Sequence, residues 1–250
     1  MDENVYVVVG DSFAAFAERT NVMTVSQLML WLEAGDMWSG HERVIIGQGI
    51  DEAVRATLQS QLALCGVACS AHVDALAPLA LTHKRSRAAV LIGEPCRTGP
   101  RSYQYDFVMN DLQDRLSDHV TGQHIGAMVL MEAARQATIA SIECEWIAAH
   151  ARPQGFILES FNSRFHTYAF PLPTSLQVRM DERERTDTQV AISLAIDFQQ
   201  GGKCVSQMQL EVRLLQADVL DRIEMRRAAQ ALEAVIRQHA PATPVPCALT

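Results

Sequence analysis

The segment 117–136 holds the residues best suited to chemistry. It carries two histidines, His119 and His124, and one carboxylate, Glu132. Imidazole and carboxylate groups are common general acids and bases of enzymes. His124 precedes Glu132 by about two helical turns, so on a helix both lie near the same side. We therefore expect His124 and Glu132 to face one pocket as acid and base, with His119 as an alternative.

A loop enters a helix in the middle of this segment. The first half is polar and contains Gly122 and Gly126, whereas the second half is rich in good helix formers. Backbone N–H groups in the first turn of a helix lack helical partners, and the helix dipole is positive there. We expect the N–H groups near Gly126, Ala127 and Met128 to bind a carbonyl oxygen that gains negative charge, as in an acyl thioester under attack.

Arg135 and Gln136 follow Glu132 by one helical turn. We expect both to contact the substrate in the same pocket. Apolar neighbours such as Met128 and Met131 would raise the pKa of Glu132 toward a value useful for acid–base catalysis. The alternative is a solvated or paired helix surface, on which Glu132 and Arg135 have no catalytic part.

The surrounding sequence predicts the elements that position this helix. A pair of strand-like runs is followed by a helical block and then by four strands, with Gly201-Gly202 as a hairpin turn between the last two. This order is that of a hotdog fold, a curved antiparallel sheet wrapped around a long central helix. The predicted ranges are 88–92 and 103–108 for the pair, 126–149 for the helix, and 155–168, 174–181, 188–199 and 204–214 for the strands.

The first 79 residues have a different pattern. Continuous apolar strands at 5–9, 44–47 and 66–69 alternate with amphipathic helices at 24–33 and 51–64. This alternation predicts a small α/β unit with a parallel sheet. The loops after the first two strands contain glycines but match no nucleotide-binding motif, so ordinary tight turns are favoured over ligand binding.

The predicted fold class is therefore α+β, a hotdog fold preceded by a small α/β domain. Residues 77–80 resemble a linker. The expected division is a small α/β domain at 1–79, a hotdog domain at 80–216, a C-terminal helix at 217–240 and a disordered tail at 241–250.

Composition excludes several classes of protein. The 250 residues carry 21 Lys and Arg against 29 Asp and Glu, a net charge of −8, and no dense basic run that would bind duplex DNA. No apolar stretch reaches the about 20 residues that span a bilayer. The acidic N-terminus lacks the basic region of a signal peptide, so we expect a cytoplasmic protein with reduced cysteines.

No metal or cofactor is expected. Cys65 and Cys69 are spaced C-x-x-x-C, with His72 as the one nearby additional ligand. A metal site needs more ligands than this, so both cysteines are interpreted as small buried residues.

The helix segment resembles the signature of the AfsA family, the A-factor biosynthesis hotdog proteins. The matching residues are Asp118-His119 and the run His124–Gln136, in which Ile-Gly-Ala-Met-Val-Leu-Met-Glu-Ala-Ala-Arg-Gln follows the histidine. Further resemblance lies in Thr82-His83-Lys84 with Val90-Leu91-Ile92, and in Arg164-Phe165 with Tyr168. The similarity covers residues 80–215 and leaves out the first 80.

This resemblance implies an acyl-thioester enzyme that transfers a β-ketoacyl group from acyl carrier protein to a hydroxyl of dihydroxyacetone phosphate, a step toward γ-butyrolactone or butenolide signals. His124 and Glu132 match the family's His and Glu. Gly126-Ala127 departs from the family's Pro-Gly at the expected oxyanion site. The family prototype holds two hotdog repeats and this chain one, so we expect a homodimer.

Other functions use the same residues. A 3-hydroxyacyl-thioester dehydratase or a thioesterase would need the same His and Glu, and a non-catalytic protein could bind an acyl group or lactone there. The donor would be a thioester of CoA or of acyl carrier protein. The short basic run with Lys84, Arg85 and Arg87 is the candidate docking patch for an acidic carrier, with a solvated loop as the alternative.

Overall fold

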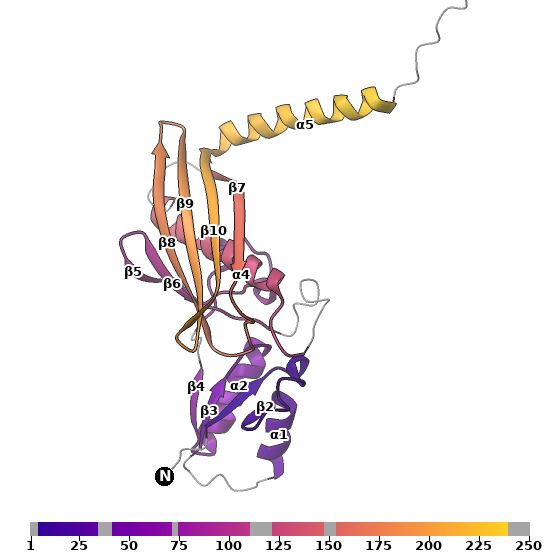
Figure 1. Cartoon of the computed structure of the whole chain (residues 1–250), viewed down its shortest axis with the longest axis vertical. Helices are drawn as coiled ribbons and strands as arrows, with labels where there is room; N and C mark the ends of the chain where they lie inside the picture. Colours follow the sequence, from indigo (N-terminus) through magenta and orange to yellow (C-terminus); the bar gives the residue numbers. More distant parts are fainter. Residues whose placement is uncertain (1–4, 35–41, 72–74, 111–121, 148–153, 240–250) are drawn as a thin grey trace, which may run out of the picture.

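The chain folds into two sheets, one in each of two adjoining units, followed by a projecting helix (Figure 1). The structure is a computed structural model and describes residues 5–34, 42–71, 75–110, 122–147 and 154–239. The first unit is a small α/β layer, and the second is a long antiparallel sheet with a helix packed against it.

The first unit contains a four-stranded parallel sheet in the order β2-β1-β3-β4. The predicted strands and helices are present, and the parallel sheet is confirmed. The short strand β2 was not predicted, because three residues give too little pattern to recognise. The elements are β1 Val5–Val9, β2 Val22–Thr24, α1 Val25–Ala34, β3 Arg43–Ile46, α2 Glu52–Leu64 and β4 Ala68–Ala71.

Helix α2 begins at a capped N-terminus. The Asp51 side chain accepts a hydrogen bond from the Ala53 N–H at 2.8 Å. The buried face carries Arg55, Leu58 and Leu62, whereas Val54, expected on that face, is 39% exposed. An arginine therefore lies where the apolar pattern predicted a valine.

The second unit contains a six-stranded antiparallel sheet in the order β5-β6-β8-β9-β10-β7. Alternating burial along β8, β9 and β10 explains why the sequence predicted these strands well. Gly201 and Gly202 have φ of 55° and 74°, as the predicted tight hairpin requires. The strands are β5 Cys96–Gly99, β6 Ser102–Asp106, β7 Gln154–Phe165, β8 Thr174–Arg185, β9 Gln189–Gln200 and β10 Lys203–Gln216.

Helix α4, Ala127–Ile142, lies against this sheet and continues into a π-helical turn, Glu143–Ile147 (Figure 1). Ala133, Ala134 and Ala137 on α4 are fully buried, which lets the helix approach the strands closely. The sheet and α4 share one apolar core. An antiparallel sheet around a long helix is the predicted hotdog fold, and it is confirmed.

The segment before this sheet differs from the prediction. Residues 77–80 are not a free linker, because Ala77 is fully buried and Leu79–Thr82 forms the short helix α3. Residues 88–92 form no regular strand, although Ile92 bridges to Phe107. A side chain of α4 replaces part of the missing strand pairing, as described below.

The two units are joined by Gln48, which is 2% exposed. Its side chain donates to the Phe107 carbonyl at 3.0 Å and accepts from the Met109 N–H at 2.8 Å. A Cβ at Gly47 would lie 2.3 Å from the Pro171 carbonyl oxygen, so the backbones touch here. This post-strand loop is therefore an interface between the units.

Helix α5, Ala217–His239, follows β10 directly and projects away from both units (Figure 1). None of its side chains is buried. The predicted tail at 241–250 lies outside the described residues. Within the described residues, no helix is long and apolar enough to cross a membrane.

Candidate active site

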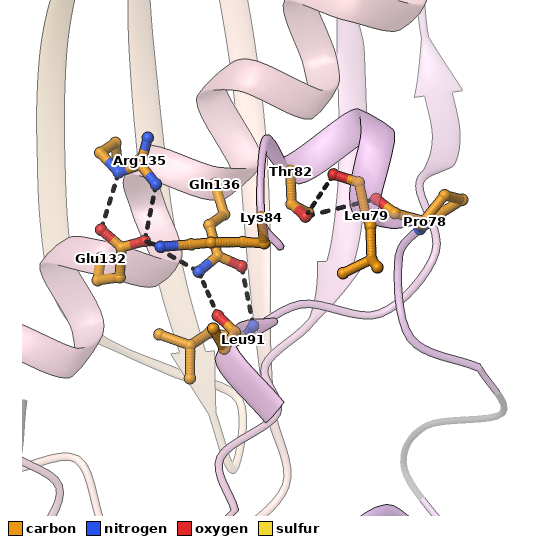
Figure 2. A network of polar contacts seen from close by, with 9 residues as sticks. Pro78, Leu79, Thr82, Lys84, Leu91, Glu132, Arg135 and Gln136 are labelled. Atoms are coloured by element: carbon orange, nitrogen blue, oxygen red, sulfur yellow. Dashed lines mark hydrogen bonds and ion pairs between the residues drawn. The ribbon is translucent and has the colours of Figure 1, made fainter. Parts of the chain in front are cut away.

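Helix α4 presents Glu132, Arg135 and Gln136 on one face, as their spacing predicted. That face is covered by the segment that follows α3, which brings Lys84 over the helix (Figure 2). The opposite face of α4 packs in the core through residues such as Ala133 and Ala137. Glu132 thus lies between α4 and a neighbouring segment rather than inside the sheet.

Glu132 accepts hydrogen bonds from three side chains (Figure 2). Arg135 donates through Nε at 2.8 Å and Nη2 at 2.9 Å, a bidentate contact. The Lys84 ammonium lies 2.5 Å from Oε1, and Gln136 Nε2 donates to the same oxygen at 3.0 Å. The cluster holds two positive charges against one negative charge.

These contacts lower the pKa of Glu132. Burial alone raises it, but the hydrogen bonds from Arg135, Lys84 and Gln136 outweigh burial and bring the pKa from its ordinary 4.5 to about 2. The predicted upward shift is therefore wrong. The sequence pattern placed Met128 and Met131 beside Glu132 but did not show that Lys84 covers it.

Gln136 is fully buried and binds the protein itself. Its side chain accepts from the Leu91 N–H at 2.8 Å and donates to the Ala89 carbonyl at 2.9 Å. These bonds satisfy backbone groups that a strand partner would otherwise pair, which explains how the segment near Leu91 is held without a regular strand. Gln136 was expected to contact the substrate, but its side chain binds the backbone at Ala89 and Leu91 instead.

The N-terminus of α4 begins after Gly126, at the position predicted for an oxyanion site. Gly126 is the N-cap residue and provides no side-chain cap. A Cβ built at Gly126 meets nothing within 4 Å among the described residues, and Met128 is 57% exposed. The N-cap residue therefore leaves the first-turn N–H groups of α4 without a cap from its own side chain.

His124 lies beside this opening. Its ring packs on Tyr168 with centroids 4.6 Å apart, and the Ile125 N–H donates to the Ala169 carbonyl at 2.8 Å to fix the loop. His124 and Glu132 thus belong to different sets of contacts: one at the helix mouth, the other with Lys84 and Arg135. The alternative histidine, His119, lies outside the described residues.

The basic run is largely engaged within the chain. Lys84 binds Glu132, and Arg87 makes a bidentate contact with Glu52 of α2 at 2.7 and 3.0 Å. Arg85 is exposed. The patch predicted to dock a carrier therefore offers mainly Arg85, because the other two charges have intramolecular partners.

The cysteine pair shows no metal geometry in the described residues. Cys65 is exposed, contrary to its interpretation as a buried residue, and Cys69 is half-buried, with burial raising its thiol pKa. His72 lies outside the described ranges. Within those ranges, no group of three potential His, Cys, Asp or Glu ligands comes together.

Two contacts near α4 were not predicted. His83 Nε2 lies 2.7 Å from Glu143 Oε1 at the far end of α4, and Tyr168 packs on His124. Lys84 was assigned to docking rather than to Glu132. Helical spacing relates residues along one helix, so it gives no signal for partners that arrive from another segment.

Comparison with known proteins identifies the second unit. The A-factor biosynthesis hotdog domain, AfsA, matches residues 70–216, more than half of the chain. No curated protein matches the sequence.

Several solved structures are similar to this chain. A probable thioesterase of Pseudomonas aeruginosa has 15% identity and a TM-score of 0.36, covering 49% of this chain and 82% of its own. A mutant thioesterase of the same organism has 15% identity and a TM-score of 0.39, covering 55% and 91%. A hypothetical thioesterase of Streptococcus pneumoniae, crystallised with coenzyme A, has 9% identity and a TM-score of 0.35, covering 49% and 85%.

Proposed function

The chain belongs to the A-factor biosynthesis hotdog family, and from that premise we propose that it acts on acyl thioesters. The reaction we favour transfers a β-ketoacyl group from CoA or acyl carrier protein to a hydroxyl acceptor. The observation that carries the proposal is the open, uncapped N-terminus of α4 beside His124. It combines oxyanion donors with an acid–base group.

In this proposal the thioester carbonyl oxygen lies against the N–H groups of Ala127 and Met128. The acceptor hydroxyl attacks the carbonyl carbon, and its proton moves to His124. The helix N-terminus stabilises the negative oxygen of the tetrahedral intermediate. The intermediate then expels the thiolate, which takes the proton back from the imidazolium, and the ester is released.

Glu132 has a different part in this proposal from the general base that its sequence position implied. With a pKa of about 2 it is a weak base, and its two oxygens already accept bonds from three side chains. We assign it as a positioning residue that fixes Lys84 and Arg135. The net positive charge of this cluster favours negatively charged groups of the substrate.

A non-catalytic acyl-binding or lactone-binding protein is the second candidate. The complete set of partners around Glu132 favours it, since a locked carboxylate is available to neither substrate nor proton. Dehydratase and thioesterase reactions would use the same helix mouth.

Product analysis by mass spectrometry distinguishes these functions. The protein is incubated with a β-ketoacyl thioester or a 3-hydroxyacyl thioester, each with and without dihydroxyacetone phosphate. We expect a released ester that requires the acceptor. Loss of water from the 3-hydroxyacyl donor would instead indicate a dehydratase, free acid a thioesterase, and binding without any product the non-catalytic function.

We further propose that the active form is a homodimer. Strands β5 and β7 are the edges of the six-stranded sheet, and the 12-residue β7 leaves a long row of backbone groups for pairing. Light scattering should give about twice the chain mass. A measured mass equal to that of one chain, at protein concentrations that support activity, would contradict the dimer.

A further inference from the structure

A pocket separate from the α4 site lies where the two units meet. It has a volume of about 490 Å³, within the usual range for small-molecule sites. One side is the N-terminal half of α2, and the other includes Arg87, Ala88, Val108 and Asn110. Neither Glu132 nor His124 lines it.

The pocket contains a buried arginine with unused bonding capacity. Arg55 is 8% exposed, and its Nε has no hydrogen-bond partner among the described residues. Its Nη2 makes a long contact of 3.4 Å with the Ile50 carbonyl. A guanidinium remains charged at physiological pH and pairs best with a carboxylate or phosphate, so a buried one without such a contact points to a missing anion.

The remaining charges limit what that anion can be. Glu52 is held by Arg87 in a bidentate ion pair, and Asp51 caps α2 through the Ala53 N–H. With Arg55 included, the four charged side chains of the pocket sum to zero. A single added negative charge is tolerated here better than the double charge of a phosphate monoester, because Asp51 and Glu52 repel both.

The pocket walls beside these charges are mainly apolar. Ile50, Leu76 and Val108 line it together with several alanines. An apolar wall next to one buried cation suits a ligand with a hydrocarbon body and one anionic end.

We propose that the pocket between the two units binds a small amphiphilic carboxylate, with its head group on Arg55 and its hydrocarbon chain against Ile50, Leu76 and Val108. This site does not depend on the proposed acyl transfer at α4. It gives the first unit a function of its own, since both α2 and Arg55 belong to it.

Isothermal titration calorimetry with octanoate tests the proposal on the full chain. Two other ligands serve as comparisons. n-Octanol has a similar hydrocarbon chain but no charge, and octyl phosphate has a similar chain with a larger negative charge. We expect octanoate to bind at least about tenfold more tightly than either. Octanol cannot form the charge-assisted hydrogen bond with Arg55, and Asp51 and Glu52 repel the second charge of octyl phosphate. Absence of octanoate binding, or equal binding of octanol or octyl phosphate, would overturn the assignment.

Variants locate the binding. Arg55→Met keeps the length and apolar stem of the side chain and should weaken octanoate binding at least about tenfold. Arg222→Met on exposed α5 is the matched control and should bind as the wild type does. Glu132→Gln should also retain octanoate, which separates this pocket from the α4 site. Octanoate affinity that is unchanged in Arg55→Met, or binding that is lost in Glu132→Gln, would contradict the proposal.

Should Arg55→Met fail to fold, Arg55→Lys gives the second test. Lysine keeps the charge but cannot form the bidentate contact with a carboxylate. We expect Arg55→Lys to bind octanoate more weakly than the wild type does, but more tightly than the wild type binds octanol. Undiminished binding in this variant would show that the guanidinium does not hold the head group.

Discussion

The ionisation of Glu132 makes the stability of the protein depend on pH. Its folded pKa of about 2 is below the ordinary 4.5, so ionised Glu132 stabilises the native state. That contribution is complete above about pH 4.5 and is lost as the pH falls toward 2. The lowering of the pKa corresponds to at most about 3 kcal/mol of folding stability. This is an upper bound, because the side chains of Lys84 and Arg135 keep partial contact with water.

Glu132→Gln therefore has a pH-dependent effect on stability. We expect the free energy of unfolding to fall by about 2–3 kcal/mol at pH 7, and the difference from wild type to shrink as the pH falls from 4.5 toward 2. Urea denaturation at a series of pH values measures this. If the difference in unfolding free energy between wild type and Glu132→Gln stays constant from pH 7 to pH 3, the ion pairs do not hold Glu132 as described.

The segment near Leu91 should depend on the Gln136 side chain of α4 for its stability, and substitution of Gln136 tests this. Gln136→Leu keeps the volume but leaves the Leu91 N–H and the Ala89 carbonyl without partners. We expect a loss of about 2–4 kcal/mol, since each unsatisfied buried group costs about 1–3 kcal/mol. Gln230→Leu on exposed α5 is the control and should change stability little. Equal unfolding free energies for the two variants would refute this role.

The contact between Gly47 and Pro171 should be intolerant of any side chain at position 47. Gly47→Ala would place a Cβ 2.3 Å from the Pro171 carbonyl oxygen, so the units must shift apart. We expect a loss of about 1–3 kcal/mol by overpacking. Gly99→Ala, where the nearest atom is an ordinary 3.8 Å away, is the control. Thermal unfolding in which both variants melt alike would contradict the close contact.

Much of the fold could be predicted because its patterns are local. Strands β8 to β10 alternate buried and exposed residues, and α4 has an unbroken run of helix formers, so both were recognised. Residues 88–92 looked like a strand, but Gln136 supplies the pairing from another element. Arg55 also follows helical spacing, yet an arginine gives no sign in the sequence that it will be buried.

The candidate site was predicted in part for the same reason. The open N-terminus of α4 follows from Gly126 and the helix that begins after it, which are neighbours in sequence. The ionisation of Glu132 depends on Lys84, almost 50 residues earlier, and a single sequence does not show that contact. Sequence spacing thus predicted the position of the N-terminus of α4, whereas it did not predict the ionisation state of Glu132.

The net charge of the protein, −8, bears on the choice of acyl donor. A negatively charged carrier protein would be repelled overall and would need a local basic contact. Since Lys84 and Arg87 are engaged within the chain, Arg85 is the exposed cation left in the run. Docking of a carrier, if the carrier is the donor, should therefore depend on Arg85.

Arg85→Glu should raise KM for a carrier-bound thioester by about tenfold and leave KM for the corresponding CoA thioester nearly unchanged. Steady-state kinetics with both donors at two salt concentrations measures this. Arg183→Glu, on β8, reverses a charge outside the run and serves as the control. Parallel changes for both donors would mean that Arg85 does not contact the carrier.

The most direct measurement is the rate of ester formation from a β-ketoacyl thioester and a hydroxyl acceptor by the wild type and His124→Gln. His239→Gln on exposed α5 is the matched histidine control. We predict ester formation well above the uncatalysed rate for the wild type and His239→Gln, and a loss of about 10²–10⁴-fold for His124→Gln with the fold intact. Folded wild-type protein that forms no ester, or His124→Gln at the wild-type rate, would contradict acyl transfer at the mouth of α4.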